Sequence, residues 1–125
     1  MARSIMPLLS VRRGAEALAF YKRAFSATEK VVLEDNGSVF AMLTVGEAEF
    51  WMSDEAPEYE NYSPESIGGA TARVIIIVDD PRASFARAVS AGATPIAEVS
   101  EMHGWLTGRV KDPFGHHWEI SRELE

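Results

Sequence analysis

The pattern of apolar and polar positions predicts short strands that alternate with two helices. In the first half of the chain, apolar runs at residues 5–11, 30–33, 39–45 and 48–53 are typical of strands. Between the first two runs, residues 15–25 carry apolar side chains at helical spacing, with Leu18, Tyr21 and Phe25 on one stripe. The first half therefore predicts a strand, a helix and three further strands.

The second half repeats this order, and Val11 corresponds to Val78, 67 positions later. The β-branched run within residues 72–78 indicates a buried strand. Asp80 and Pro81 then supply a cap and a first residue for a helix that ends before Gly92. Strands are expected at 94–99, 106–110 and 117–121. Identity between the halves is weak, so the repeat is inferred from the order and spacing of its elements.

The segment between the halves has a different composition. Five acidic residues, with no basic residue among them, and two prolines predict a loop or linker at about residues 54–70. We therefore predict a single α+β domain of two tandem βαβββ modules, at about residues 5–53 and 71–121.

Composition and charge narrow the classes of function. The chain has 125 residues, 46% of them apolar and 25% charged, as in an ordinary globular protein. The absence of cysteine excludes disulfides, thiolate metal sites and a cysteine nucleophile. The formal net charge of -7 argues against nucleic acid as a partner, because binding to phosphates needs a basic surface. No apolar stretch is long enough to span a membrane and no signal peptide is evident, so we expect a cytoplasmic protein without a membrane partner.

Three segments resemble the glyoxalase/bleomycin resistance/dioxygenase superfamily, also called vicinal-oxygen-chelate proteins. These segments are the helix at 15–25 with its Phe20-Tyr21 pair, the Val78-Asp79-Asp80-Pro81 entry to the second helix, and the turn at 112–116, Asp-Pro-Phe-Gly-His. The turn is the most specific of them, and the whole chain is most similar to the small bacterial glyoxalase-like or PhnB-like subgroup. The resemblance implies cupped half-barrels that pair in a homodimer, often with exchanged halves, to enclose a small-molecule ligand.

Metal-using members of that superfamily place ligands on the first and last strands of each half. By this resemblance, the first-strand positions fall on Met6 and Arg73, neither of which suits a divalent metal. The last-strand positions fall on Glu49 and Glu119, which do. A shift of register by one residue would let His117 supply an imidazole. No cofactor is therefore the preferred expectation, and a divalent metal held by Glu49, His117 and Glu119 is the alternative.

Glu119 also has an interpretation without a metal. It can pair with Arg73 on a neighbouring strand, since an arginine stands where a ligand is absent. Such an ion pair would also clamp a carboxylate or carbonyl group of a ligand.

Several large side chains on the predicted strands are candidates for the wall of a ligand pocket. Trp51 lies two residues after Glu49, so both should share one face of their strand. Broad aromatic faces suit stacking on a flat ligand ring, although packing in the core or in a dimer interface is the alternative for each residue. The candidates are Phe40, Met42, Trp51, Trp105 and Trp118.

Tyr59 and Tyr62 stand in the acidic linker and could cover the mouth of the cavity. A lid with a negative rim would favour a cationic ligand, whereas the alternative is a solvated loop with two surface tyrosines.

Three functions follow from these observations. The preferred one is a binding protein that sequesters a partly aromatic, antibiotic-like ligand without a metal, and that is not an enzyme. A metal-dependent lyase, isomerase or dioxygenase is the first alternative. A non-catalytic interaction protein is the second.

Overall fold

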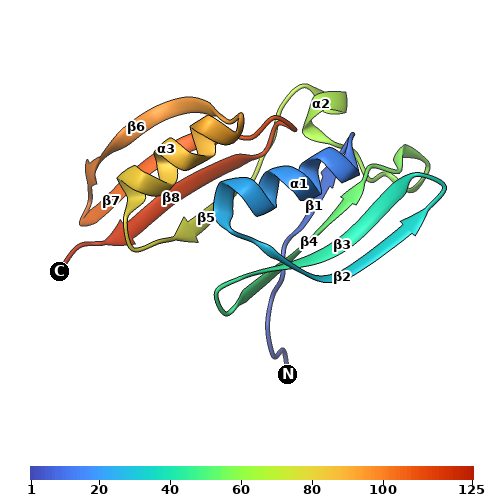
Figure 1. Cartoon of the computed structure of the whole chain (residues 1–125), viewed down its shortest axis with the longest axis horizontal. Coiled ribbons are helices and arrows are strands. Elements are labelled where there is room, and N and C mark those ends of the chain that lie inside the picture. The colour runs from blue at the N-terminus through green and yellow to red at the C-terminus, as the bar shows by residue number, and fades with distance from the viewer.

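The computed structural model describes residues 1–125 and contains two modules with the same order of elements (Figure 1). The first module comprises β1 (Leu8–Val11), α1 (Gly14–Phe25), β2 (Thr28–Asp35), β3 (Ser38–Val45) and β4 (Ala48–Asp54). The second comprises β5 (Arg73–Ile77), α3 (Pro81–Ala91), β6 (Thr94–Met102), β7 (Trp105–Lys111) and β8 (His117–Glu123). The α+β fold class expected from the sequence is confirmed. No helix is long and apolar enough to cross a membrane.

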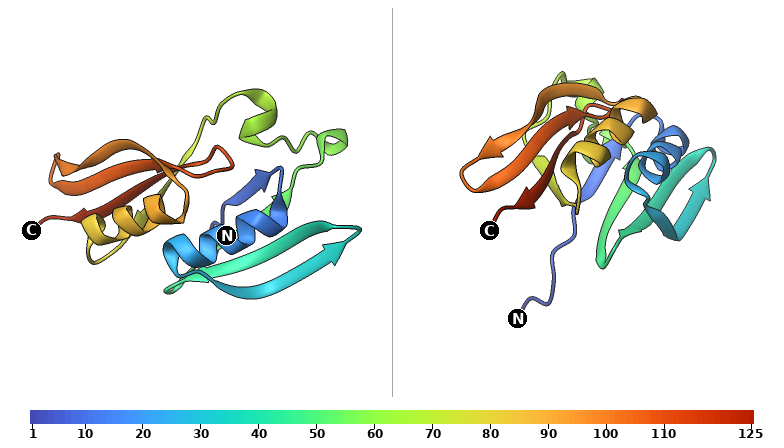
Figure 2. Two further views of the ribbon diagram at one scale, coloured as in Figure 1. Left: turned by 45° about the horizontal axis from the view of Figure 1, so that its top comes forward. Right: turned by 60° about the vertical axis from the view of Figure 1, so that its left-hand side comes forward.

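Each module folds its four strands into one sheet with the first strand beside the last. The orders are β1-β4-β3-β2 and β5-β8-β7-β6, with β1–β4 and β5–β8 parallel and the other pairs antiparallel. The sheets curve but remain open, and they lie side by side rather than face to face (Figures 1 and 2). One face of each sheet is covered by its module's helix, and the other face is free.

The core lies between the helices and the sheets. On β3, β4 and the first half of β8, buried residues alternate with more exposed ones, as expected for a sheet covered on one face. At the junction of the modules, Tyr21 and Phe25 of α1 pack against Trp118 of β8, with ring centroids 5.4 and 4.5 Å apart. Phe50 of β4 lies 5.6 Å from Trp118. One aromatic cluster therefore contains side chains from both modules and packs them together.

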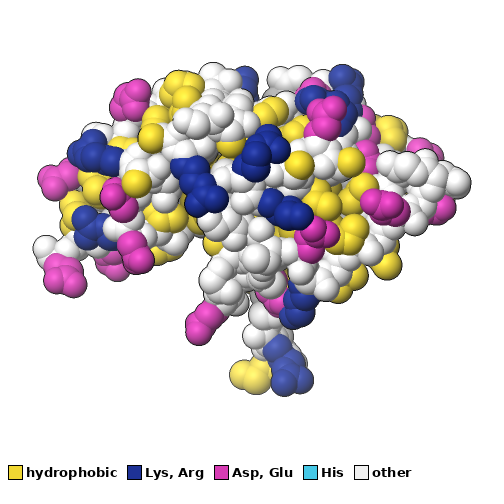
Figure 3. All heavy atoms as spheres, viewed as in Figure 1, with side chains coloured by type: hydrophobic (Ala, Val, Ile, Leu, Met, Phe, Trp, Pro, Cys, Tyr) yellow, Lys and Arg dark blue, Asp and Glu magenta, His cyan; other side chains and the backbone are white.

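The two helices also pack against each other. Arg87 of α3 donates to the carbonyl oxygen of Arg23 at 2.7 Å and to the Ser26 hydroxyl at 2.6 Å, just beyond α1. Figure 3 shows Lys and Arg side chains gathered where the helices meet, with most Asp and Glu side chains toward the two ends of the molecule. Arg87 thus satisfies one carbonyl at the carboxyl end of α1, where positive charge is favourable.

Buried Asp112 connects the modules through a single carboxylate. Its Oδ2 accepts from the Tyr21 hydroxyl at 2.6 Å and from Trp118 Nε1 at 2.9 Å. Its Oδ1 accepts from the backbone N–H groups of Phe114 and His116, both at 2.9 Å. Burial first, and then the charge of Asp112, raise the pKa of Tyr21 well above its ordinary value. The carboxylate thus fixes both the Asp-Pro-Phe-Gly-His turn and its contact with α1.

The linker contains regular structure that the sequence analysis did not predict. A 3-10 turn, η1 (Pro57–Tyr59), is followed by the short helix α2 (Pro64–Ile67). The Ser63 hydroxyl accepts from the backbone N–H of Ser66, and Pro64 occupies the first helical position. The Ser63-Pro64 pair is the signal that could have located this helix.

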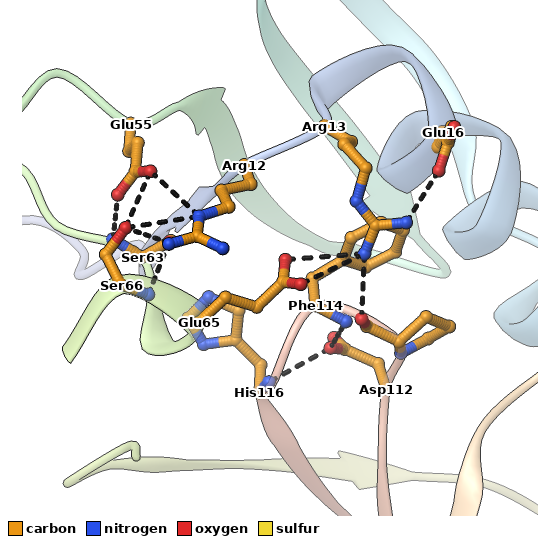
Figure 4. Close-up of polar contacts among 11 residues, drawn as sticks. Arg12, Arg13, Glu16, Glu55, Ser63, Glu65, Ser66, Asp112, Phe114 and His116 are labelled. Carbon is orange, nitrogen blue, oxygen red and sulfur yellow. Dashed lines mark hydrogen bonds and ion pairs between the residues drawn. The ribbon is translucent and has the colours of Figure 1, made fainter. Parts of the chain in front are cut away.

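Polar contacts attach the linker to the rest of the chain (Figure 4). The Glu55 carboxylate accepts from the backbone N–H of Ser63 and from the Ser66 hydroxyl, both at 2.8 Å, and pairs with Arg12 at 3.5 Å. Arg13 pairs with Glu65 at 3.3 Å. Arg13 also donates to the Pro113 carbonyl at 3.1 Å and lies over the Phe114 ring, 5.0 Å from its centroid. Both arginines thus tie the start of α1 to the linker, and Arg13 also reaches the turn before β8.

Candidate functional site

The candidate site comprises the two sheet faces that point away from the helices, which we call the first and second cup faces. Residues that pair directly across neighbouring strands share a face, so the strand register identifies the members. The first cup face consists of Leu8, Ser10, Val31, Leu33, Phe40, Met42, Thr44, Glu49, Trp51 and Ser53. The second includes Arg73, Ile75, Ile77, Met102, Trp105, Thr107, Arg109, Lys111, His117, Glu119, Ser121 and Glu123.

The first cup face is aromatic and largely uncharged. Trp51 pairs with Leu8 on one side and with Met42 on the other, and its ring lies 5.0 Å from that of Phe40. Phe40 is 38% exposed and Leu8 is 50% exposed, so the face presents adjacent apolar side chains to the surface. Glu49 forms an ion pair with Lys30 at one end of the face. Phe40, Met42 and Trp51 are therefore adjacent and open, as a ligand wall requires.

The second cup face carries its charges around Glu119. Its Oε2 accepts from Arg73 Nε at 3.2 Å, and its Oε1 lies 3.9 Å from Arg109 Nη2. The structure thus contains the Arg73–Glu119 pair considered from the sequence. It adds Arg109, which the sequence analysis did not select. The signal for Arg109 is its place on β7 directly opposite Glu119, and this pairing is visible only once the register is known.

His117 lies on the same cup face as Glu119, two residues along β8, so no shift of register is needed to bring it there. Its neighbours across the sheet are Arg73 and Lys111. Its Nδ1 is buried and has no hydrogen-bond partner. Burial, followed by the positive charges of Arg109 and Lys111, lowers the pKa of His117 from its ordinary value of 6.5. Both influences disfavour the charged imidazolium.

Three of the expected site residues lie elsewhere. Trp118 is only 2% exposed, because it points from β8 toward the helices and fills the aromatic cluster at the module junction. Tyr59 and Tyr62 are 76% and 48% exposed in the linker, and neither lines a hollow of the second cup face or of the groove between the modules. Ion pairs of Glu55 with Arg12 and of Glu65 with Arg13 hold the acidic linker beside the start of α1, and its ribbon is shown in Figure 2.

The register also corrects the pairing of Glu49 with Glu119 between the modules. Leu8 pairs with Trp51, and Ile75, its counterpart 67 residues later, pairs with Glu119. Trp51 is therefore the structural counterpart of Glu119, and Glu49 that of His117. Glu49 and Glu119 therefore stand two residues out of step with each other in their sheets.

The two carboxylates considered for a divalent metal are already paired with cationic side chains. Glu119 is already shared between two arginines, whose charges oppose a second cation beside it. Glu49 is paired with Lys30 and lies on the other sheet. Nowhere does the chain bring three His, Cys, Asp or Glu side chains together as a metal site.

Two hollows adjoin the cup faces. One, of about 230 Å³, is lined by Ile75, Met102, His103, Trp105, Thr107, Glu119 and Ser121. The other is a groove of about 490 Å³ between the modules. Its lining includes residues 4–7, 47–50 and 74–77 together with Trp118. Within one chain the structure groups the residues of each cup face, but the two faces do not close over each other.

Comparison with known proteins places this geometry in a family. A family profile described as the glyoxalase At5g48480-like C-terminal domain matches residues 73–121, which is β5 to β8. The chain belongs to the glyoxalase/bleomycin resistance/dioxygenase superfamily. An uncharacterised protein of Mycobacterium bovis is 33% identical over 127 residues, covering 97% of this chain and 84% of that protein.

Solved structures of the glyoxalase/bleomycin resistance fold superpose over nearly the whole chain. The Arabidopsis thaliana gene product AT5G48480 is 28% identical with a TM-score of 0.77, covering 98% of this chain and 100% of that one. TioX from Micromonospora sp. ML1 is 25% identical with a TM-score of 0.77 and the same two coverages. The superfamily assignment inferred from the helix and turn motifs is therefore confirmed.

Proposed function

We propose that this protein is a metal-independent binding protein that holds a small, partly aromatic ligand between cup faces of two chains in a homodimer. The supporting observation is that both cup faces are left open in the single chain although they carry large apolar side chains. Ile75 and Ile77 are each 60% exposed, Met102 is 55% exposed and Leu8 is 50% exposed. Contiguous apolar surface of this kind usually marks an interface or a ligand site.

Aromatic side chains on both faces suit the ligand class. Trp51 and Phe40 offer broad rings on the first cup face, and Trp105 does so on the second. A flat ring placed between the faces could stack on either wall. The antibiotic-like ligand implied by the family name belongs to this class.

A metal-dependent lyase, isomerase or dioxygenase is the second candidate. Two observations favour it: His117 and Glu119 share a face, and the Nδ1 of His117 is free of hydrogen bonds. A neutral imidazole is also the form that binds metal. The ion pairs of Glu119 with Arg73 and Arg109 argue against this candidate.

One experiment separates the two candidates. Purified, untagged protein is assayed for bound metal, and its melting temperature is followed as Mn²⁺, Ni²⁺, Zn²⁺ and Fe²⁺ are added. The proposed function predicts no stoichiometric metal and no ion-specific stabilisation. A shift with one ion that Glu119→Gln removes would instead establish the metal enzyme.

Binding itself is tested by a screen of flat aromatic compounds followed by tryptophan fluorescence. Trp51→Ala should weaken binding of a hit by about tenfold, because a stacking wall is lost. Tyr59→Ala, which removes an exposed aromatic side chain outside both cup faces, should leave the affinity unchanged. An equal loss of melting temperature with unchanged affinity in Trp51→Ala would make Trp51 a packing residue.

A further inference from the structure

The second cup face has an excess of positive charge in a chain that is acidic overall. Arg73, Arg109 and Lys111 supply three cations around one carboxylate, that of Glu119. Glu123 shares the face but lies two residue pairs farther along β8. The whole chain carries a formal net charge of -7. A local excess of this sign favours an anion at this place.

Glu119 does not use up the donors of the two arginines. A guanidinium group has five N–H donors. Arg73 donates one hydrogen bond, through Nε, and its side chain is 53% exposed. Arg109 donates none, because its contact with Glu119 at 3.9 Å is too long for a hydrogen bond, and its side chain is 32% exposed. Most of their N–H donors are therefore free to bind a ligand.

Apolar surface lies directly beside these donors. Ile75 pairs with Glu119 across the sheet and lines the hollow of about 230 Å³ together with Met102 and Trp105. This volume is below the roughly 300–1,000 Å³ of pockets for drug-sized ligands. The hollow therefore suits a single ring or a small apolar group rather than a whole large ligand.

We propose that Arg73 and Arg109 form an anion subsite, which binds the carboxylate, phosphate or phosphonate group of a ligand whose ring fills the neighbouring hollow. The inference rests on the proposed function and deepens it by assigning the sign of the ligand's charge. Both guanidinium groups approach the Glu119 carboxylate, at 3.2 and 3.9 Å, so they lie near each other, and each keeps N–H donors for an anion. It replaces the expectation of a cationic ligand, because two of the linker carboxylates are paired with Arg12 and Arg13, whereas the second cup face has an excess of positive charge.

The test uses four probes with the same ring and different head groups: benzoate, phenylphosphonate, benzamide and benzylamine. Their dissociation constants are measured by NMR titration of the purified full chain, with the indole N–H signals of Trp51 and Trp105 as site reporters. At least one of the two anions should bind about tenfold or more tightly than benzamide, since only an anion forms charge-assisted hydrogen bonds with the guanidinium groups. The tighter of the two anions identifies the preferred head group.

Matched variants locate the effect. Arg109→Gln and Arg73→Gln should each cut the preference for the anion over benzamide to about threefold or less, because one charged donor is lost. Arg122→Gln removes the same charge from an exposed position on β8 that lies off the second cup face, and should keep the full preference. Retained preference in both Arg73→Gln and Arg109→Gln would overturn the subsite.

The outcomes also separate this inference from the proposed function. Equal binding of benzamide and the anions at the indole reporters, or tightest binding of benzylamine, would overturn the anion subsite and leave the binding function standing. If none of the four probes perturbs either reporter, the proposed function fails and the subsite fails with it.

Discussion

At the scale of single residues, Asp112 joins the two modules through one buried carboxylate. It accepts four hydrogen bonds, two of them from side chains of other elements and two from the turn that follows it. Buried donors that lose their acceptor cost about 1–3 kcal/mol each. The side chain is thus a structural residue of the fold rather than part of the ligand site.

Asp112→Ala should therefore lower the free energy of unfolding by about 3 kcal/mol or more, because the Tyr21 hydroxyl and Trp118 Nε1 are left unsatisfied. The measurement is urea denaturation followed by circular dichroism. Asp79→Ala provides the control, since Asp79 is exposed and makes no side-chain hydrogen bond. Similar losses in the two variants would contradict the role assigned to Asp112.

The sequence predicts some site residues better than others for a physical reason. Alternation along β4 correctly predicts that Trp51 and Glu49 lie on the same face of the sheet. The ion pair between Arg73 and Glu119 was also expected, because the two residues stand on strands that were predicted to be neighbours. Trp118 was predicted to line the cup, but its side chain lies on the face that the helices cover. Alternation divides the residues of a strand between two faces and does not show which face the helices cover. Arg109 was missed because its contact depends on pairing between strands, which a single sequence does not specify.

At the scale of elements, the strands and the two long helices were predictable because each contains an apolar run or a helical stripe of apolar side chains. The helix α2 has only four residues, too few for helical periodicity to be detected. Its position depends instead on the contacts of Glu55 with Ser63, Ser66 and Arg12. Those contacts, led by the backbone N–H of Ser63, lower the pKa of Glu55 from its ordinary value of 4.5.

This shift has a defined consequence for acid stability. Because the folded pKa lies below the unfolded one, the unfolded chain binds the proton first as the pH falls through 4.5. The stabilisation is present above pH 4.5 and is lost as the pH falls through the folded pKa. Glu55→Gln should therefore be less stable than the natural chain at pH 7, and the difference should shrink toward acid.

Unfolding free energies measured in urea across the acid range would check this expectation. Glu58→Gln is the control, since Glu58 is an exposed linker carboxylate without an ion pair or side-chain hydrogen bond. A difference that stays constant with pH would show that the Glu55 carboxylate is not linked to the fold in this way.

At the scale of the whole molecule, two open sheets with exposed apolar faces argue for association. Closing each cup face against a second chain would cover Ile75 and Ile77 without changing the fold of either module. The fold itself could be read from the sequence, since repeated order and spacing determine the class. The pairing of chains could not, because it depends on surfaces whose contacts are not encoded in local patterns.

We expect the protein in solution to have twice the mass of one chain by light scattering coupled to size exclusion. Ile77→Lys should shift it toward the monomer, because a charge would be buried in the interface. Ile67→Lys is a matched control: Ile67 is also 60% exposed but lies in α2, away from both cup faces. A monomeric natural chain, or equal dissociation in both variants, would contradict the proposed pairing.

The pairing of the first strand with the last in each module sets the order in which a newly made chain can fold. β1 can pair with β4 only after β4 has been synthesised. The Tyr21 hydroxyl can donate its hydrogen bond only after Asp112, which lies 91 residues later in the chain, has been synthesised. Until Trp118 emerges, the aromatic side chains of α1 lack part of their covering. The first module therefore emerges from the ribosome with exposed apolar surface. We expect a chain that ends before β8 to keep this surface exposed and to be bound by chaperones or degraded by proteases.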